Sequence, residues 1–317
     1  MHAVMKRALA APLALALFHH VGGAVPVQEP HTPTFTGGVD LVTVSVVVNN
    51  HQGRPVVGLS RQDFDLFDAG QARAIVDFRS EPAPVSVAIL LDASGSMKIG
   101  RRWSEAREAI AKLAAELNRD GDRIALFTFD TGLHDVQPFT SSPADAIRRL
   151  EDVRPWGSTA LYDAIAQTGR QVAAQGRSRR AVVVVTDGID NRSHSSAADV
   201  SAVASALDTP VYSVVVASTL DRHDDGPDGD GSAVGLHGTL EDLSRWTGGA
   251  LFVSSAPTEA GEAARKIVAE LRHQYLMTFE PSAPAGWHPL LVRVHQGDFV
   301  ARTRRGYVAG PRASGQH

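Results

Sequence analysis

The chain has 317 residues, of which 43% are hydrophobic, and a formal net charge of -4 at pH 7. A chain of this length and composition can bury a core and hold about two domains. The mild negative charge argues against nucleic-acid binding, which needs a basic surface. Cysteine is absent, which excludes disulfides, thiolate metal sites and a cysteine nucleophile.

Residues 1–24 have the pattern of a secretory signal peptide. Lys6 and Arg7 precede an apolar run at 8–18, and small residues follow it. The run is shorter than the ~20 residues that span a bilayer, so we expect cleavage and not a membrane anchor. Residues 25–38 contain three prolines and are predicted to form an extended tether. The mature protein is therefore expected to be exported, to the periplasm or outside the cell, without a transmembrane segment.

Residues 39–84 are predicted to be rich in β-structure. Apolar and polar residues alternate over 39–48, which indicates a half-buried strand. Shorter strands are expected at 64–67 and 74–78, and a proline pair then separates this part from the next. No helix-length pattern occurs before residue 100.

Between residues 85 and 272, apolar strands alternate with helical patterns. Strands are expected at 85–91, 124–129, 133–139, 181–185, 211–216 and 251–253, with 133–139 at a sheet edge. Helices are expected at 103–117, 142–153, 160–174, 196–207, 239–247 and 259–271, the fifth of them capped by Thr239. This alternation predicts the α/β fold class: a doubly wound, mostly parallel sheet with helices on both faces.

After residue 272 the apolar period returns to two. The strands expected there are 275–279, 290–294 and 299–304. These strands are too few to cover their own apolar face, and the same holds for the strands of 39–84. We therefore predict that 39–84 and 273–308 combine into one smaller, all-β, sandwich-like domain. The α/β domain of 85–272 is then an insertion in it, and 309–317 form a tail.

The first strand of the α/β part ends in a candidate metal site. Its apolar run is followed by Asp92, Ser94 and Ser96. Open α/β sheets bind their ligands at the carboxyl ends of parallel strands. One carboxylate and two hydroxyls are hard oxygen ligands, which suit Mg²⁺ or Mn²⁺ and not zinc or copper.

Two later loops can complete this oxygen set. Thr159 precedes a predicted helix, and Asp187 follows the apolar strand at 181–185, so both are expected at the same edge of the sheet. Each residue also has a simpler interpretation, in which the serines cap the helix after the strand and Asp187 caps the next turn. Agreement among three loops favours the metal site.

The order Asp92-x-Ser94-x-Ser96, Thr159 and Asp187 resembles the metal-ion-dependent adhesion site of von Willebrand factor type A domains. The resemblance covers the whole predicted α/β part. It implies a divalent cation with one open coordination position, which an aspartate or glutamate of a protein partner fills. It also implies that Ser94, Ser96 and Thr159 ligate directly, and that Asp92 and Asp187 ligate directly or through water.

The β-rich flanks are similar to the von Willebrand factor A-related proteins described from acidobacteria. The similarity is carried by G-x-P-V-x-G-L at residues 53–59, by Asp63-Phe64, and by Arg305-Gly306-Tyr307. The function of that family is poorly known, so this second resemblance does not indicate a function for the chain.

The leading hypothesis is a non-enzymatic, exported adhesion or assembly module that binds a partner carboxylate through Mg²⁺ or Mn²⁺. An envelope structural protein with a vestigial metal site is the alternative. A metal-assisted hydrolase ranks lower, because no motif supplies a nucleophile or general base beside the oxygen ligands.

Three other features have a role left open. The acidic loop at 221–230 lacks the spacing of an EF-hand, so it is interpreted as a solvated, mobile loop, with a Ca²⁺ site as the alternative. Trp156 either rims the metal face or is ordinary packing. The arginines Arg302, Arg304 and Arg305 are interpreted as an exposed strand face, to which an anionic polymer could bind.

Overall fold

The structure is a computed structural model. It describes residues 41–176, 179–206, 208–216, 232–281, 285–295 and 297–309. Four predicted features therefore lie wholly or almost wholly outside the described residues: the signal peptide at 1–24, the tether at 25–38, the acidic loop at 221–230 and the tail at 309–317. Within the described ranges, no helix has the length and apolar character needed to cross a membrane.

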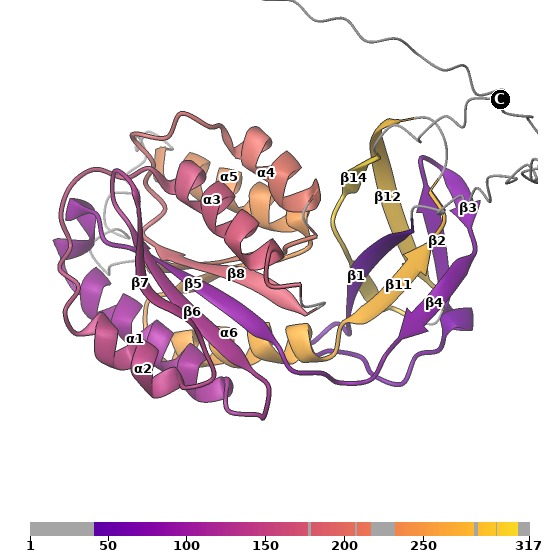
Figure 1. The fold of residues 1–317 in the computed structure, drawn as a ribbon, viewed down its shortest axis with the longest axis horizontal. Helices are drawn as coiled ribbons and strands as arrows, with labels where there is room; N and C mark the ends of the chain where they lie inside the picture. Colours follow the sequence, from indigo (N-terminus) through magenta and orange to yellow (C-terminus); the bar gives the residue numbers. More distant parts are fainter. Residues whose placement is uncertain are drawn as a thin grey trace, which may run out of the picture. The chain divides into compact units, whose positions relative to one another are not determined.

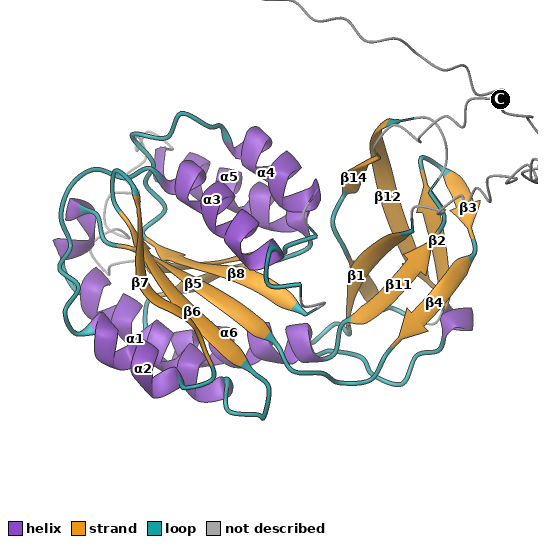
Figure 2. Cartoon of the chain, viewed as in Figure 1, coloured by secondary structure: helices purple, strands orange, loops and turns teal. Residues whose placement is uncertain are grey.

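A six-stranded sheet forms the centre of the α/β part (Figures 1 and 2). Its strands are β5 Ser86–Asp92, β6 Arg123–Phe129, β7 Leu133–Thr140, β8 Arg180–Thr186, β9 Val211–Val216 and β10 Leu251–Ser254. The order is β10-β9-β8-β5-β6-β7, and all neighbours are parallel except β6 and β7. Strand β7 is the edge strand expected at 133–139.

Helices cover both faces of this sheet (Figure 2). They are α1 Arg102–Glu116, α2 Pro143–Leu150, α3 Leu161–Ala173, α4 Ala197–Ala206, α5 Ser232–Thr247 and α6 Pro257–Arg272, with a short 3-10 helix, η2 Gly95–Lys98, before α1. One face carries α1, α2 and α6, and the other carries α3, α4 and α5.

The predicted cap at Thr239 is wrong. Helix α5 begins at Ser232, so Thr239 lies inside it. The Thr-x-x-Asp pattern of a capping box recurs there by chance, and backbone N–H groups within a helix already have partners in the preceding turn.

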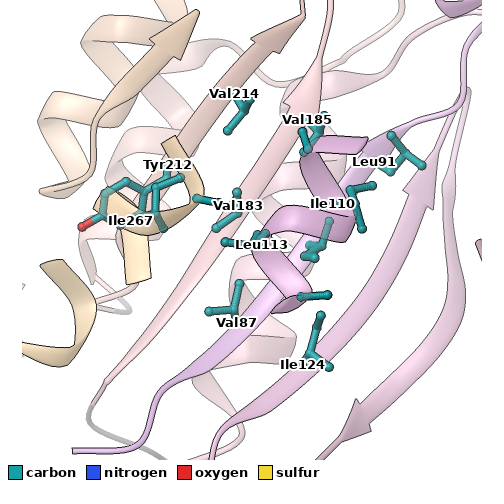
Figure 3. Close-up of a cluster of buried hydrophobic side chains, with 14 of the residues drawn as sticks. Val87, Leu91, Ile110, Leu113, Ile124, Val183, Val185, Tyr212, Val214 and Ile267 are labelled. Carbon is teal, nitrogen blue, oxygen red and sulfur yellow. The ribbon is translucent and has the colours of Figure 1, made fainter. Parts of the chain in front are cut away.

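Strand β5 is buried on both faces. Val87 and Leu91 belong to the cluster that contains Ile110 and Leu113 of α1 (Figure 3). Residues between them along the strand, such as Leu90, pack on the opposite face, against α3 and α4. Both faces are apolar for this reason, and the strand reads as a continuous apolar run and not as an alternating one.

The strand order reverses between β5 and β8. The chain passes from β5 to β6 and β7 on one side, and then returns through α2 and α3 to β8 on the other side of β5. Ligands of open α/β sheets bind at such a switch point, beyond the carboxyl ends of the strands. Asp92 ends β5 and Asp187 follows β8, so both lie at this point.

Two four-stranded antiparallel sheets combine both ends of the described chain (Figure 1). Their strands are β1 Val42–Asn49, β2 Phe64–Asp68, β3 Gln71–Arg73, β4 Ile75–Arg79, β11 Tyr275–Phe279, β12 Gly286–Val294, β13 Val300–Arg302 and β14 Gly306–Ala309. The orders are β13-β1-β11-β4 and β14-β12-β2-β3. Pairing of β1 with β11 and of β2 with β12 joins early strands to late ones.

The predicted fold class, a mostly parallel α/β sheet accompanied by antiparallel β-sheets from both ends of the chain, is confirmed.

Strand β3 is absent from the sequence prediction. It pairs with β2 through a tight turn at Ala69 and Gly70, whose φ angles are 49° and 79°. Two positive φ values are typical of the turns that join two-residue hairpins. Three residues are too few to show a period of two, so only the turn was visible in the sequence.

Two of the three late arginines are not exposed, which corrects the sequence prediction. Arg304 is 5% exposed and lies 3.4 Å (Nε to Oδ1) from Asp208. Arg302 donates a hydrogen bond to the buried Glu270 of α6. These side chains join the β-sheets to the α/β part. Arg305 is exposed and lies over the ring of Trp246.

Residues 85–272, expressed alone, are predicted to fold cooperatively, because the sheet and its own helices close their core. We expect a lower melting temperature than that of the full chain, because Glu270 and Asp208 lose their arginine partners. Circular dichroism with thermal melting measures both. A fragment without a cooperative transition would contradict the domain boundaries at 84/85 and 272/273, which stay predictions until then.

Candidate metal centre

Asp92 is held at the end of β5 by two hydrogen bonds. It is fully buried. Its Oδ1 accepts the backbone N–H of Ser94 at 2.9 Å, and its Oδ2 accepts the hydroxyl of Thr186 at 2.6 Å. The carboxylate therefore has one orientation, set by the loop after β5 and by the end of β8.

The hydroxyl oxygens of Ser94 and Ser96 lie 3.0 Å apart. Mg²⁺ holds oxygen ligands at about 2.0–2.1 Å in an octahedron, which places neighbouring ligand oxygens about 2.9 Å from each other. The two serines thus have the spacing of adjacent ligands on one ion. The distance also fits a hydrogen bond between them, in which either oxygen can donate.

The loop before α3 is bonded to the loop after β5. The N–H of Gly95 donates to the carbonyl of Gly157 at 2.9 Å, and the N–H of Trp156 donates to the carbonyl of Ala93 at 2.6 Å. A Cβ at Gly95 would lie 3.2 Å from the Gly157 oxygen, so the close approach of the two loops favours glycine there.

The same loop is bonded to the segment after β8. The carbonyl of Thr159 accepts the N–H groups of Asn191 and Arg192 at 3.1 and 3.0 Å, and its N–H donates to Oδ1 of Asn191 at 2.9 Å. Thr159 is 1% exposed, and within the described part of the chain its hydroxyl forms no hydrogen bond. Thr159 is thus tied by its backbone to the segment after β8, and its hydroxyl stays available as a ligand.

Asp187 forms an ion pair that the sequence did not predict. Its Oδ1 accepts the N–H of Ile189 at 3.2 Å, and its Oδ2 accepts Nη1 of Arg102 at 3.0 Å. The same Nη1 donates to the carbonyl of Ser96 at 3.3 Å. Arg102 opens α1, and its side chain is only 10% exposed. The contact brings the loops of Ser96 and Asp187 together.

The capping interpretation fits only part of the site. Ser94 occupies the N-cap position of η2, yet its side chain forms no capping bond. Ala160, and not Thr159, occupies the N-cap position of α3. Asp187 does accept the N–H of Ile189, as a turn-capping residue would. Helix and turn caps therefore leave the hydroxyls of Ser94 and Thr159 unexplained.

Carboxylates alone do not form a metal site here. Among the residues that the structure describes, no group of three or more His, Asp or Glu side chains is placed to hold a metal ion. The candidate centre therefore depends on its hydroxyls as much as on Asp92 and Asp187.

The candidate metal centre lies within a segment of the chain that matches a known domain family. Residues 87–189 match the model of the von Willebrand factor type A domain family. The match runs from β5 to the turn after β8 and includes all five predicted site residues. A comparison with curated proteins gives no match.

Solved structures similar to this chain include an aerotolerance-related membrane protein from Bacteroides fragilis, with 22% identity and a TM-score of 0.48 over 59% of this chain and 98% of that one. The protein BatB from Bacteroides thetaiotaomicron has 21% identity and a TM-score of 0.45, over 58% and 97%. A von Willebrand factor type A protein from Catenulispora acidiphila has 15% identity and a TM-score of 0.48, over 89% and 76%. At these values the likeness concerns the fold and carries no argument about function.

Three polar residues of the type A domain were missed by sequence reasoning: Arg102, Thr186 and Asn191. Thr186 and Asn191 lie in the mostly polar run T-D-G-I-D-N, which begins at the last residue of β8, and that run was the available signal. Arg102 gave no such signal, because Arg101 beside it has the same charge and a side chain that is 76% exposed.

Trp156 is not packed into the type A domain. It is 74% exposed, and Nζ of Lys98 lies 4.7 Å from the centre of its ring. Its backbone is bonded to the loop of Asp92 through Ala93. Of the two roles considered for Trp156, the structure supports a place at the rim of the candidate centre.

Burial raises the pKa of Asp92 to about 6. Loss of water around the carboxylate is the largest cause. The hydrogen bonds from Ser94 and Thr186 lower the pKa, and the negative charge of Asp187 raises it. A cation at this site would act in the opposite direction, because it favours the ionised form.

In the metal-free protein, this pKa predicts a loss of stability as the pH rises from about 4 to about 6. The native state keeps the proton of Asp92 up to about pH 6, whereas the unfolded chain releases it near 3.8. The native state thus binds more protons in this window, and the free energy of unfolding falls with rising pH. The full effect of one such carboxyl is on the order of 3 kcal/mol.

Urea denaturation at several pH values, with chelator present, measures this slope. Asp92→Asn should flatten it, because the amide does not titrate. Asp298→Asn, at a side chain that is 86% exposed, is the matched control and should keep the slope of the original protein. Equal slopes for the original protein and Asp92→Asn would refute the assignment.

Proposed function

We propose that this chain is an exported, non-enzymatic binding protein that captures a carboxylate of a protein partner through Mg²⁺ or Mn²⁺. The observation that carries the proposal is the meeting of three loops of the type A domain at the switch point of its sheet. Backbone hydrogen bonds and Arg102 hold these loops together, and the hydroxyls of Ser94 and Ser96 have the spacing of adjacent ligands. Export rests on the sequence pattern of residues 1–24.

In this proposal Ser94, Ser96 and Thr159 provide hydroxyl ligands, and Asp92 and Asp187 act directly or through water. Hydroxyls and water neutralise a divalent ion less than carboxylates do. The bound ion would thus supply a positive charge with an open position that attracts an external carboxylate. The hydrogen bonds of Thr186 and of the Ser94 backbone orient Asp92 for this role, as outer partners of metal ligands do.

Binding is a better account of the site than catalysis. A metal-assisted hydrolase needs a group that accepts or donates a proton beside the ion. Among the residues that the structure describes, the side chain that pairs with Asp187 is that of Arg102, and a guanidinium only donates hydrogen bonds and accepts none. It cannot serve as a general base.

One observation favours the second candidate, an envelope structural protein with a vestigial metal site. Arg102 already provides a positive charge to Asp187, and a positive side chain can replace a metal ion in holding buried carboxylates. In that case partner binding would not depend on a divalent ion.

Partner capture separates the two candidates. We expect the chain from residue 25 onward, used as bait in envelope extracts, to retain a protein with Mg²⁺ present and to lose it with chelator. Asp92→Ala should lose the same protein under both conditions, because the ion can no longer be held. Capture that is equal with Mg²⁺, with chelator and in Asp92→Ala would establish the structural role instead.

Thr159→Val tests the ligand set without disturbing the fold. The change keeps the shape of the side chain and leaves no buried donor unpaired, so stability without metal should stay nearly the same. The increase in melting temperature with Mg²⁺ should be strongly reduced, because one ligand is lost. At a hundredfold excess over Kd a bound ion adds about 2.7 kcal/mol, so the reduction is measurable.

Thr159→Ser should keep most of the metal response, because the hydroxyl remains. Thr168→Val is the control, since Thr168 is fully buried in α3 and its hydroxyl has no bond among the described residues. A loss of about 0.5–2 kcal/mol without metal, with an intact metal response, would show that Thr159 is only a cap.

A further inference from the structure

Arg102 places a fixed positive charge inside the candidate metal centre. Its Nη1 lies 3.0 Å from Oδ2 of Asp187 and 3.3 Å from the carbonyl oxygen of Ser96. The side chain of Arg102 is 10% exposed and that of Asp187 is 1% exposed. The pair is therefore largely shielded from water and salt, which weakens screening of its charges.

A divalent ion and Arg102 would both draw on the carboxylate of Asp187, which already pairs with Arg102. Asp187 carries a single negative charge, which the guanidinium matches in the metal-free protein. An ion held between Ser96 and Asp187 would lie within a few ångströms of a guanidinium that contacts both residues. Like charges at such a distance in a shielded site repel strongly.

We propose that Arg102 is a built-in counter-ion that competes with the divalent cation for Asp187, so that metal binding requires the Arg102–Asp187 pair to open. This inference rests on the proposed metal site and adds a mechanism that regulates it. The metal-free protein is then a closed state in which Arg102 pairs with Asp187. The ion binds with the affinity that remains after the pair has been displaced.

If Arg102 instead helps the ion to bind, its removal would change the metal affinity in the opposite direction. A residue that only orients Asp187 would help the ion to bind, as outer partners of metal ligands usually do. Removal of a competitor raises metal affinity, whereas removal of an orienting residue lowers it. The direction of the change therefore separates the two roles.

The test is the affinity for Mn²⁺, measured by isothermal titration calorimetry on the full mature chain. Arg102→Gln removes the charge and keeps amide N–H donors near Asp187. We expect its Kd to fall on the order of tenfold, within the usual range of coupling between two binding events. Arg101→Gln removes the same charge from the neighbouring, 76% exposed side chain, and its Kd should stay close to that of the original protein.

The possible results have distinct meanings. The inference is supported if Arg102→Gln binds Mn²⁺ more tightly than the original protein and Arg101→Gln does not. The same holds if the original protein binds Mn²⁺ too weakly to measure. Unchanged or weaker binding in Arg102→Gln, with clear binding by the original protein, overturns the inference and leaves the proposed function standing. If none of the three proteins binds Mn²⁺, the proposed function fails and the inference fails with it.

A second measurement uses the original protein and so does not depend on the folding of a variant. A dicarbonyl reagent that modifies exposed arginines is applied with and without Mn²⁺, and modified residues are located by mass spectrometry. Opening of the pair predicts that Mn²⁺ increases modification of Arg102 and leaves Arg101 unchanged. Equal or lower modification of Arg102 with Mn²⁺ bound overturns the inference.

Discussion

The complete burial of β5 is the constraint on which the rest of the structure depends. All seven of its residues are buried, and it is hydrogen-bonded to β8 on one side and β6 on the other. A strand with two neighbours and two covered faces has little freedom to move. The loop that begins at Asp92 therefore starts from a fixed point, and a metal centre needs ligands whose positions are fixed to within a fraction of an ångström.

Much of the fold could be predicted because parallel strands covered on both faces must be apolar throughout, and the site residues follow directly at their ends. What the sequence could not show is which member of a like-charged group is buried. Arg101 and Arg102 are neighbours with the same charge, yet tertiary packing buries only Arg102. Arg304 was interpreted as exposed, because its partner Asp208 lies in a distant segment. Such long-range pairs leave no local pattern.

The motifs that resemble a second family have structural roles in the β-sheets. Asp63 accepts the N–H and the hydroxyl of Ser60 and so fixes the turn before β2. The N–H of Leu59 donates to the hydroxyl of Tyr275, and the hydroxyl of Tyr307 donates to the buried Asp68. These bonds give Leu59, Asp63 and Tyr307 of those motifs a place in the packing of the β-sheets.

Two buried carboxylates at one sheet edge need a positive charge, and this chain offers two sources. A divalent ion would satisfy Asp92 and Asp187 together, whereas Arg102 pairs with Asp187, and the pKa of Asp92 is raised to about 6. The arginine is therefore an incomplete substitute. It balances one carboxylate, while burial still disfavours ionisation of the other. An ion that displaces Arg102 would lose one favourable pair and gain two, which is why the pair can regulate the site without closing it permanently.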